Sequence, residues 1–356
     1  MKKILTVVGA RPQFIKAATI SRIIKEQYAD SIEEIIVHTG QHYDQNMSDI
    51  FFKEMQIPSP THSLNIGGKS HGEMTGEMLI KMEALLLQEK PDIVLVYGDT
   101  NSTLAGALAA SKLHIPVAHV EAGMRAFNKR IPEEVNRVLT DHITSHFFCT
   151  TDEPANNLRN EGLNKGIHIV GDVMYDAVLF YRKIMKPTAI VQSLPKDFYL
   201  VTTHRQENTD IKENLSAIFK ALTELSKQKI VVFPMHPRTR KYIDNYGITI
   251  PEGITLLDPV GYFDMLYLLE NASLVLTDSG GLQKEAYYFN KPAVIMRDQT
   301  EWTELVENDV AKLTGADTDK ILDAVNKLKG ITAFPKNLYG DGHAAEKIVK
   351  ILSAQL

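Results

Sequence analysis

Short polar clusters along the chain combine carboxylates, cations and histidines, the side chains that move protons and hold anions. Each cluster directly follows a short apolar run. The clusters are Gly9–Pro12, Thr39–His42, Tyr97–Thr100, His119–Gly123, Thr203–Arg205, Met235–Arg238 and Asp278–Gly281. Ligands of parallel α/β sheets bind beyond the carboxyl ends of the strands, so this recurrence predicts a polar site built from strand ends.

The stretch from Leu274 to Glu285 has the chemistry of a phosphate site. Its apolar run stops at Asp278, and a helix-like pattern begins after Ser279-Gly280-Gly281. Free N–H groups and the positive dipole end at a helix start attract anions, and glycines let a ligand approach the backbone closely. Glu285, one turn into the helix, could reach a sugar hydroxyl. An ordinary strand-to-helix connection would have the same pattern.

Three carboxylates are candidates for proton transfer. Asp99 could instead cap the helix expected near Thr103, and the two roles are compatible. Glu121 stands at a strand end and has no evident capping role, which favours chemistry. Glu133 and Glu134 follow Pro132 and could merely stabilise a helix start.

Basic residues accompany these carboxylates. His204, between Thr203 and Arg205, is better explained as a ligand-facing group than as a core histidine. Arg11 and Lys16 lie beside the end of the first strand, where contact with an anion is a better interpretation than a solvated charge. For His236, a role in ligand contact and a purely structural role remain equally open.

The surrounding pattern predicts two parallel α/β domains. The expected strands are Ile4–Val8, Glu34–His38, Asp92–Val96, Val117–Val120, His146–Cys149, Tyr199–Thr203, Ile230–Pro234, Thr255–Leu257, Leu274–Thr277 and Ala293–Met296. The expected helices of the first half are Pro12–Lys25, Ser70–Lys90, Thr103–Leu113 and Glu133–Ser145, and Ser70 with Glu73 predicts a capping box. Strands apolar on both faces belong in parallel sheets covered by helices, and two doubly wound domains imply a cleft between them.

The domain boundary is expected near residues 186–196. This region contains two prolines, which favour a loop. We expect residues 1–171 to form an N-terminal Rossmann-like domain with the catalytic carboxylates. Residues 172–342 would form a C-terminal Rossmann-like domain that binds the nucleotide, and a C-terminal helix over 343–356 would pack back on the first domain.

Composition excludes several classes of protein. The 356 residues carry a formal net charge of −5 and a sequence pI near 6.2, which argues against a general nucleic-acid binder. Cys149 is the only cysteine, so no intrachain disulfide is possible, and its apolar setting predicts a buried thiol. No apolar run approaches membrane-spanning length, and we expect a cytoplasmic protein.

Sequence motifs narrow the chemistry further. No strand is followed by G-x-G-x-x-G, and neither a Walker A motif, a G-x-S-x-G elbow nor an H-E-x-x-H zinc motif occurs. What remains is a set of carboxylates from the first half and a phosphate-binding turn from the second. This combination suits acid/base chemistry on the sugar of a nucleotide sugar. We expect neither a metal nor a cofactor to take part.

The ordered motifs resemble those of the non-hydrolysing UDP-N-acetylglucosamine 2-epimerase family over nearly the whole chain. The matching segments are Gly9–Pro12 with Lys16, Tyr97–Thr100, His119–Arg125, Pro132–Arg137, Thr203–Arg205, Asp278–Glu285 and Met296–Asp298 with Glu301. The resemblance implies a GT-B type fold, no redox cofactor and a homodimer. It also implies inversion at C2 of a UDP-2-acetamido sugar, by elimination of UDP to a 2-acetamidoglucal and re-addition.

Residue roles follow from the same resemblance. Asp99, Glu121 and Glu133 would take part in proton transfer, with Lys16 and His204 also in the catalytic group. The substrate would be bound by Arg11, Ser279, Gly280, Gly281, Glu285, His236, Arg137 and Arg297. Within this set, Arg11 and the Ser-Gly-Gly turn would hold the diphosphate and Glu285 the ribose.

The chain departs from the family's commonest first motif, Gly-Thr-Arg-Pro-Glu, at Ala10 and Gln13. The form found here resembles the branch acting on UDP-2,3-diacetamido-2,3-dideoxyglucuronate. The loss of a negative charge at Gln13 would suit that sugar's carboxylate, and the segment between Arg125 and Pro132 is also short. Gln41-His42-Tyr43 matches only part of the segment associated with allosteric substrate binding in bacterial members.

Three alternatives remain. A GT-B glycosyltransferase would use a UDP-sugar donor and need an acceptor site, which no motif marks. A hydrolysing 2-epimerase would share most of these residues. A sugar-nucleotide sensor would not need the three carboxylates.

Overall fold

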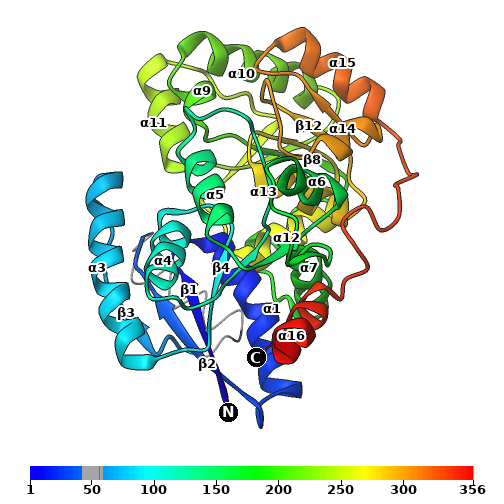
Figure 1. The fold of residues 1–356 in the computed structure, drawn as a ribbon. Coiled ribbons are helices and arrows are strands. Elements are labelled where there is room, and N and C mark those ends of the chain that lie inside the picture. The colour runs from blue at the N-terminus through cyan, green and yellow to red at the C-terminus, as the bar shows by residue number, and fades with distance from the viewer. Residues whose placement is uncertain (42–55, 57–58, 356) are drawn as a thin grey trace. The chain divides into compact units, whose positions relative to one another are not determined.

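The structure, a computed structural model, describes residues 1–41, 56 and 59–355, which fold into two compact units (Figure 1). Unit 1 comprises Met1–Leu179 and Asn337–Leu356, and unit 2 comprises Phe180–Lys336. The change from one to the other falls within the helix α7 (Val173–Ile184).

Unit 1 is built on a parallel sheet with the strand order β3-β2-β1-β4-β5-β6-β7. Its strands are β1 (Lys2–Val8), β2 (Ile32–His38), β3 (His62–Ser63), β4 (Ile93–Tyr97), β5 (Val117–Val120), β6 (His146–Cys149) and β7 (Ile167–Ile169). Its helices are α1 (Arg11–Gln27), α3 (His71–Glu89), α4 (Asn101–Lys112), α5 (Pro132–His142), α6 (Asp152–Asn160) and α16 (Ala344–Gln355), together with the first part of α7.

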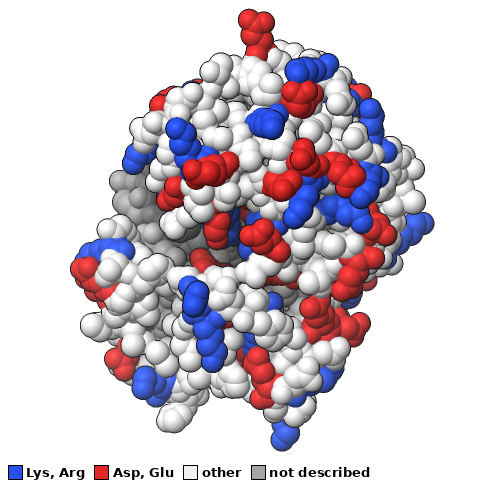
Figure 2. Space-filling view, turned by 90° about the horizontal axis from the view of Figure 1, so that it is seen from above, with Lys and Arg blue, Asp and Glu red and all other residues white. Residues whose placement is uncertain are grey.

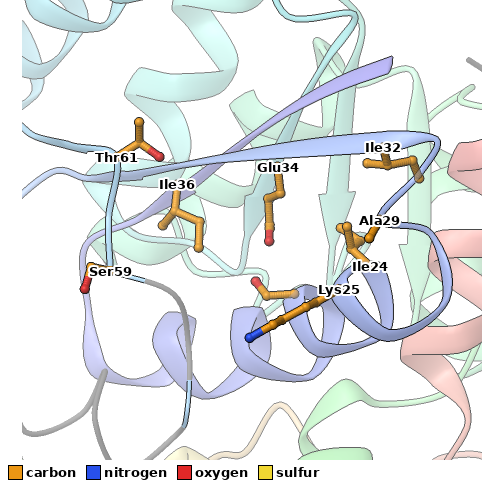
Figure 3. A pocket seen from close by; sticks show the side chains of 9 residues that line it. Ile24, Lys25, Ala29, Ile32, Glu34, Ile36, Ser59 and Thr61 are labelled. Carbon is orange, nitrogen blue, oxygen red and sulfur yellow. The ribbon is translucent and has the colours of Figure 1, made fainter. Parts of the chain in front are cut away.

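The two faces of this sheet have different cores, because side chains alternate along each strand. Leu5 and Val7 of β1 pack with apolar residues of α3 and α4. Thr6, on the opposite face of β1, bonds to Glu34 of β2, whose side chain lies on the side of α1 (Figure 3). α16 packs against α1, so the last helix of the chain completes the first unit.

Unit 2 repeats this plan with the strand order β10-β9-β8-β11-β12-β13, again all parallel. Its strands are β8 (Phe198–Thr202), β9 (Val231–Pro234), β10 (Ile254–Leu257), β11 (Ala272–Thr277), β12 (Ala293–Ile295) and β13 (Ala311–Leu313). Its helices are α8 (Ala189–Gln192), α9 (Gln206–Thr209), α10 (Lys212–Ser226), α11 (Pro237–Tyr246), α12 (Tyr262–Asn271), α13 (Gly280–Tyr288), α14 (Thr303–Glu307) and α15 (Thr318–Leu328).

Both sheets place their topological switch point between two central strands. In unit 1 the order reverses between β1 and β4, and in unit 2 it reverses between β8 and β11. Ligands of doubly wound sheets bind beyond the carboxyl ends of the strands at such a point. A site is therefore expected at the turns that follow these four strands.

Most predicted elements are confirmed, with ends shifted by a few residues. Ser70 accepts a hydrogen bond from the backbone N–H of Glu73 at the start of α3, as the capping pattern predicts. The prediction of a plain loop over 186–196 is wrong in part, since it contains α8. Three strands, β3, β7 and β13, were not predicted, and each has only two or three residues.

The cysteine and the surface charges can be compared with what the sequence predicts. Cys149 is buried, as predicted, and burial raises the pKa of its thiol to about 12. In the part of the chain that the structure describes, no helix is long and apolar enough to cross a membrane. Figure 2 shows one face of the molecule on which Lys and Arg side chains are interspersed with Asp and Glu.

Candidate active site

The switch point of unit 1 brings Lys16 and Glu121 into contact. Lys16 lies on α1, the helix that follows β1 in the chain. Its ammonium pairs with the Glu121 carboxylate at the end of β5. Both side chains are largely buried, 7% and 13% exposed. Glu121 has a φ of +70°, a conformation that residues other than glycine rarely adopt. Strain of this kind concentrates at functional sites.

The turn after β4 lies directly beside this pair. Gly98 has a φ of +61°, and a Cβ built there would lie 3.5 Å from Glu121 Oε2 and 3.6 Å from Lys16 Nζ. The next residue in the turn is Asp99. Three of the catalytic residues predicted from the sequence, Lys16, Asp99 and Glu121, therefore gather at the switch point.

Asp99 does not cap the following helix. The N-cap of α4 is Thr100, whose hydroxyl accepts from the N–H of Thr103, so the capping interpretation of Asp99 is wrong. The Asp99 carboxylate instead pairs with Arg137 of α5. Asn136 of the same helix donates to the Asp99 carbonyl at 2.9 Å.

The two glutamates at the start of α5 have different environments. Glu134 is buried, accepts from the backbone N–H groups of Ala126 and Phe127, and pairs with Arg137 at 3.2 Å. Glu133 is exposed. Both lie in the first turn of α5, where a carboxylate stabilises the helix start, so the structural explanation applies to Glu133 as well as to Glu134.

His119 and Asp141 form a buried pair next to the turn after β4. His119 contacts Asp141 Oδ1 through Nδ1 at 2.8 Å and the Gly98 carbonyl through Nε2 at 2.7 Å. Asp141 also accepts from the Gly123 N–H and from Arg125. Burial opposes the charge of Asp141, but His119 and Arg125 outweigh it and lower the pKa of that carboxyl.

In unit 2, the turn after β11 opens α13 with two glycines. Ser279 is the N-cap, with no hydrogen bond from its side chain to the helix, and Gly280 and Gly281 are the first helical residues. A Cβ built at Gly281 would meet no atom within 4 Å. One built at Gly280 would lie 4.0 Å from the guanidinium groups of Arg205 and Arg297. The helix start thus combines free N–H groups with two cations, which is the chemistry of a diphosphate site.

Asp278 holds the neighbouring turn after β8 in place. Its fully buried carboxylate accepts from the Thr203 hydroxyl at 2.6 Å and from the backbone N–H groups of His204 and Arg205. Asn208 donates to it as well, at 3.0 Å. The two turns at the switch point of unit 2 are therefore fastened to each other through one carboxylate.

His204 and His236 lie close together, with ring centroids 5.5 Å apart. Burial lowers the pKa of His204, Asp278 opposes this, and His236 and Arg205 add to the lowering. Burial and Arg238 lower the pKa of His236. Nδ1 of His236 accepts from the Arg238 N–H at the start of α11, so this ring nitrogen has no proton.

The other predicted binding residues lie on the expected elements. Arg11 is the first residue of α1, and Arg137 bonds to both Asp99 and Glu134. Glu285 lies in α13 and is 8% exposed, and Arg297 pairs with Glu301 at 3.0 Å. His42 and Tyr43, which match part of the segment associated with allosteric substrate binding in bacterial members, lie outside the described residues.

Several residues near these turns were not predicted as site residues. Trp302 donates to the Gly280 carbonyl at 2.9 Å, and Lys284 lies 3.8 Å from the centre of its ring. Arg205 and Asp278 stood within quoted motifs, but nothing in the sequence distinguished them from their neighbours. Trp302 is the only tryptophan of the chain, and that composition signal could have drawn attention to it.

A pocket of about 190 Å³ lies elsewhere in unit 1, between α1 and β2 (Figure 3). Ile24, Ile32 and Ile36 line it together with Glu34, whose pKa is raised by burial. It lies under α1 and not at the strand ends. No group of three or more His, Cys, Asp or Glu residues that could hold a metal ion occurs among the residues described.

Known proteins of one family are similar to this chain over nearly its whole length. The family model described as UDP-N-acetylglucosamine 2-epimerase matches residues 25–353. A UDP-N-acetylglucosamine 2-epimerase homolog of Methanococcus maripaludis is 52% identical, over 98% of this chain and 99% of its own. The UDP-2,3-diacetamido-2,3-dideoxy-D-glucuronate 2-epimerase of Pseudomonas aeruginosa is 51% identical, over 99% of each chain.

A solved structure is similar as well. The crystal structure of Methanocaldococcus jannaschii UDP-GlcNAc 2-epimerase in complex with UDP-GlcNAc and UDP is 43% identical, with a TM-score of 0.90 over 99% of this chain and 100% of that chain. The fold is thus of the GT-B type, with two Rossmann-like domains, and its site belongs to an isomerase. The chain belongs to the UDP-N-acetylglucosamine 2-epimerase family.

Proposed function

We propose that the protein reversibly inverts C2 of a UDP-2-acetamido sugar without hydrolysing it. The sugar is either UDP-N-acetylglucosamine or UDP-2,3-diacetamido-2,3-dideoxyglucuronate, the substrate classes named for its relatives. In the first half-reaction the C2 proton leaves, the bond from C1 to the UDP oxygen breaks, and a 2-acetamidoglucal forms. In the second, a proton adds to the other face of C2 and UDP returns to C1.

The observation that carries this proposal is the Lys16–Glu121 pair beside the Asp99 turn. Breaking a C2–H bond needs a positioned base, and protonating the opposite face needs an acid. Two carboxylates and an ammonium at one switch point supply both. Glu133, exposed at the start of α5, is the third carboxylate of the proposed group.

Unit 2 is proposed to hold the group that leaves and returns. The N–H groups at Gly280 and Gly281, with Arg297 and Arg205 nearby, would bind the diphosphate, whose negative charge increases as the C1–O bond breaks. Ser279 and Arg11 would add to this binding, and Glu285 would bind the ribose hydroxyls.

His204 and His236 are proposed to contact the substrate from the turns after β8 and β9. Arg137 would act through the Asp99 carboxylate that it holds. In this assignment the catalytic carboxylates lie in residues 1–171 and most of the nucleotide-binding residues in 172–342, with Arg11 and the catalytic His204 as the exceptions. A homodimer in the cytoplasm is part of the same proposal.

Incubation of each UDP-sugar with the enzyme alone in deuterated water tests the reaction. We expect deuterium at C2 in both epimers, with the UDP-sugar bond intact. Release of free N-acetylmannosamine would indicate a hydrolysing 2-epimerase. Absence of exchange, with sugar transfer to an added acceptor, would indicate a glycosyltransferase. Comparing kcat/KM for the two sugars identifies the substrate.

A further inference from the structure

The side chain of Gln13 joins two turns of the site in unit 1. Its Oε1 atom accepts from the backbone N–H groups of Gly9 and Ala10, at 2.8 and 3.0 Å. Its Nε2 atom donates to the Tyr97 carbonyl at 2.7 Å. The reverse orientation of the amide would set N–H against N–H and oxygen against oxygen, so the contacts themselves fix which atom is nitrogen.

The turn that Gln13 reaches has three successive carbonyls, each accepting from a side chain of a different element. Gln13 of α1 holds the Tyr97 carbonyl, His119 of β5 holds that of Gly98, and Asn136 of α5 holds that of Asp99. The donor groups are all buried. A turn fastened at three consecutive peptide groups has little freedom, which fixes where the Asp99 side chain begins.

Gln13 is itself 2% exposed, and both ends of its amide are used within unit 1. Thr100 and Thr103 provide two more partners for Nε2, each at 2.9 Å. A side chain occupied in this way has no group left to bind a sugar directly. Any effect of its missing charge on the sugar's carboxylate would therefore act at a distance and not through a direct contact.

We propose that Gln13 is a positioning residue for the epimerisation, which uses its amide to lock the Tyr97–Asp99 turn against the start of α1. This inference rests on the proposed function, because it concerns the reaction in which Asp99 takes part. One side of the group accepts from two N–H donors while the other side donates to a carbonyl. A glutamate, which stands at this position in the family's commonest motif, can make the same contacts only when its carboxyl is protonated.

Gln13→Glu tests this requirement with almost no change of shape. An ionised carboxylate can only accept hydrogen bonds, so its second oxygen would face the Tyr97 carbonyl and repel it. A protonated carboxyl can donate to that carbonyl and restore the contact. The pKa of the introduced Glu should thus be raised in the folded state, and its favourable contribution should be lost as pH rises through that pKa.

We therefore expect acid rescue of the variant. Near pH 5.5, Gln13→Glu should approach wild-type turnover, and by pH 8 its kcat should fall at least about tenfold relative to wild type, since small misplacements of catalytic groups have effects of this size. KM should change little, and both sugars should be affected equally. The melting temperature should fall relative to wild type over the same pH range. Gln228→Glu, at an exposed glutamine, is the matched control and should show neither effect.

Two results would overturn the inference. One is a Gln13→Glu enzyme with wild-type kcat and wild-type melting temperature across the whole pH range. The other is a variant whose preference between the two sugars changes while kcat does not, which would place Gln13 in sugar selection. A wild-type chain that epimerises neither sugar would instead overturn the proposed function, and the melting measurement would still report whether the Gln13 contacts exist.

Discussion

The Nε2 atom of His119 lies 2.7 Å from the carbonyl oxygen of Gly98, while its Nδ1 atom lies 2.8 Å from Asp141. Both contacts are fully buried. The carboxylate and the carbonyl are both acceptors, and each faces one nitrogen of the ring. Asp141 therefore orients the imidazole that contacts the Gly98 carbonyl.

Asp141→Asn should destabilise the protein. The Asn amide is neutral, whereas the Asp141 carboxylate contacts His119, Arg125 and the Gly123 N–H. Breaking a buried ion pair costs about 3 kcal/mol. The free energy of unfolding in urea at pH 7 measures this. Because the folded pKa of Asp141 is lowered, its stabilisation is present above the unfolded pKa and is lost as pH falls through the folded value, so the difference from wild type should shrink in acid.

The control for this substitution is Asp323→Asn, which removes an exposed pair with Lys327. Exposed pairs contribute at most about 1 kcal/mol, so this variant should be close to wild type. Equal unfolding free energies for Asp141→Asn and wild type would mean that the buried network does not support the turn.

Glu121→Gln should abolish most of the exchange at C2. The amide keeps the shape of the side chain but can neither take nor return a proton, and acid/base groups contribute about 10²- to 10⁴-fold. Deuterium incorporation from solvent, followed by mass spectrometry, is the measurement. Glu83→Gln, at an exposed glutamate of α3, is the matched control. Wild-type exchange in Glu121→Gln would remove Glu121 from the proposed catalytic group.

Gly281→Ala should weaken the binding of UDP without lowering the stability of the fold. The new methyl group meets no protein atom within 4 Å, so the melting temperature should stay level or rise. The same methyl group would occupy the space that a diphosphate needs, and we expect the Kd for UDP to rise about tenfold, or about 1.4 kcal/mol.

Gly76→Ala is the control for this change, because Gly76 lies in α3 and its added Cβ also meets no atom within 4 Å. It should leave UDP binding unchanged. Wild-type UDP affinity in Gly281→Ala, measured by calorimetry, would mean that UDP does not approach the start of α13.

UDP binding should be accompanied by proton uptake near pH 6.5. Burial lowers the pKa of His204 in the unliganded protein, and a bound diphosphate would raise it again. Binding enthalpies in buffers of different ionisation enthalpy give the number of protons taken up. His204→Gln should reduce that number, and His114→Asn, at an exposed histidine, should not. Equal uptake in wild type and His204→Gln would place the diphosphate away from His204.

The same shift predicts the stability of the unliganded protein in acid. A histidine whose folded pKa is lowered binds fewer protons in the folded state than in the unfolded state. The free energy of unfolding should therefore fall as pH drops through about 6.5, the unfolded value, and His204→Gln should reduce this slope.

Sequence patterns predicted the central strands well because these strands are continuous apolar runs ended by polar residues. Val117–Val120 and His146–Cys149 were predicted with the observed ends. The edge strands β3, β7 and β13 were missed because two or three residues are too few to show an apolar run or an alternation of apolar and polar side chains.

Long-range partners limited the prediction of the site. Asp99 was identified, but its carboxylate is held by Arg137, which lies 38 residues further on and on another element. Spacing along the chain could not show that the amide of Gln13 reaches Tyr97, 84 residues away, so the sequence alone supports only an argument from its missing charge. Local patterns locate strand ends, whereas these contacts depend on strand order.

Glu121 also couples the strain of its turn to the charge of Lys16. Its left-handed backbone would be relaxed by glycine, since a residue with a Cβ is destabilised in that region by roughly 1 kcal/mol or more. Glycine would also leave the largely buried Lys16 ammonium without its partner, and breaking a buried ion pair costs about 3 kcal/mol. The ion pair therefore outweighs the strain, so the side chain that the proposed reaction uses at residue 121 is also one that the fold needs.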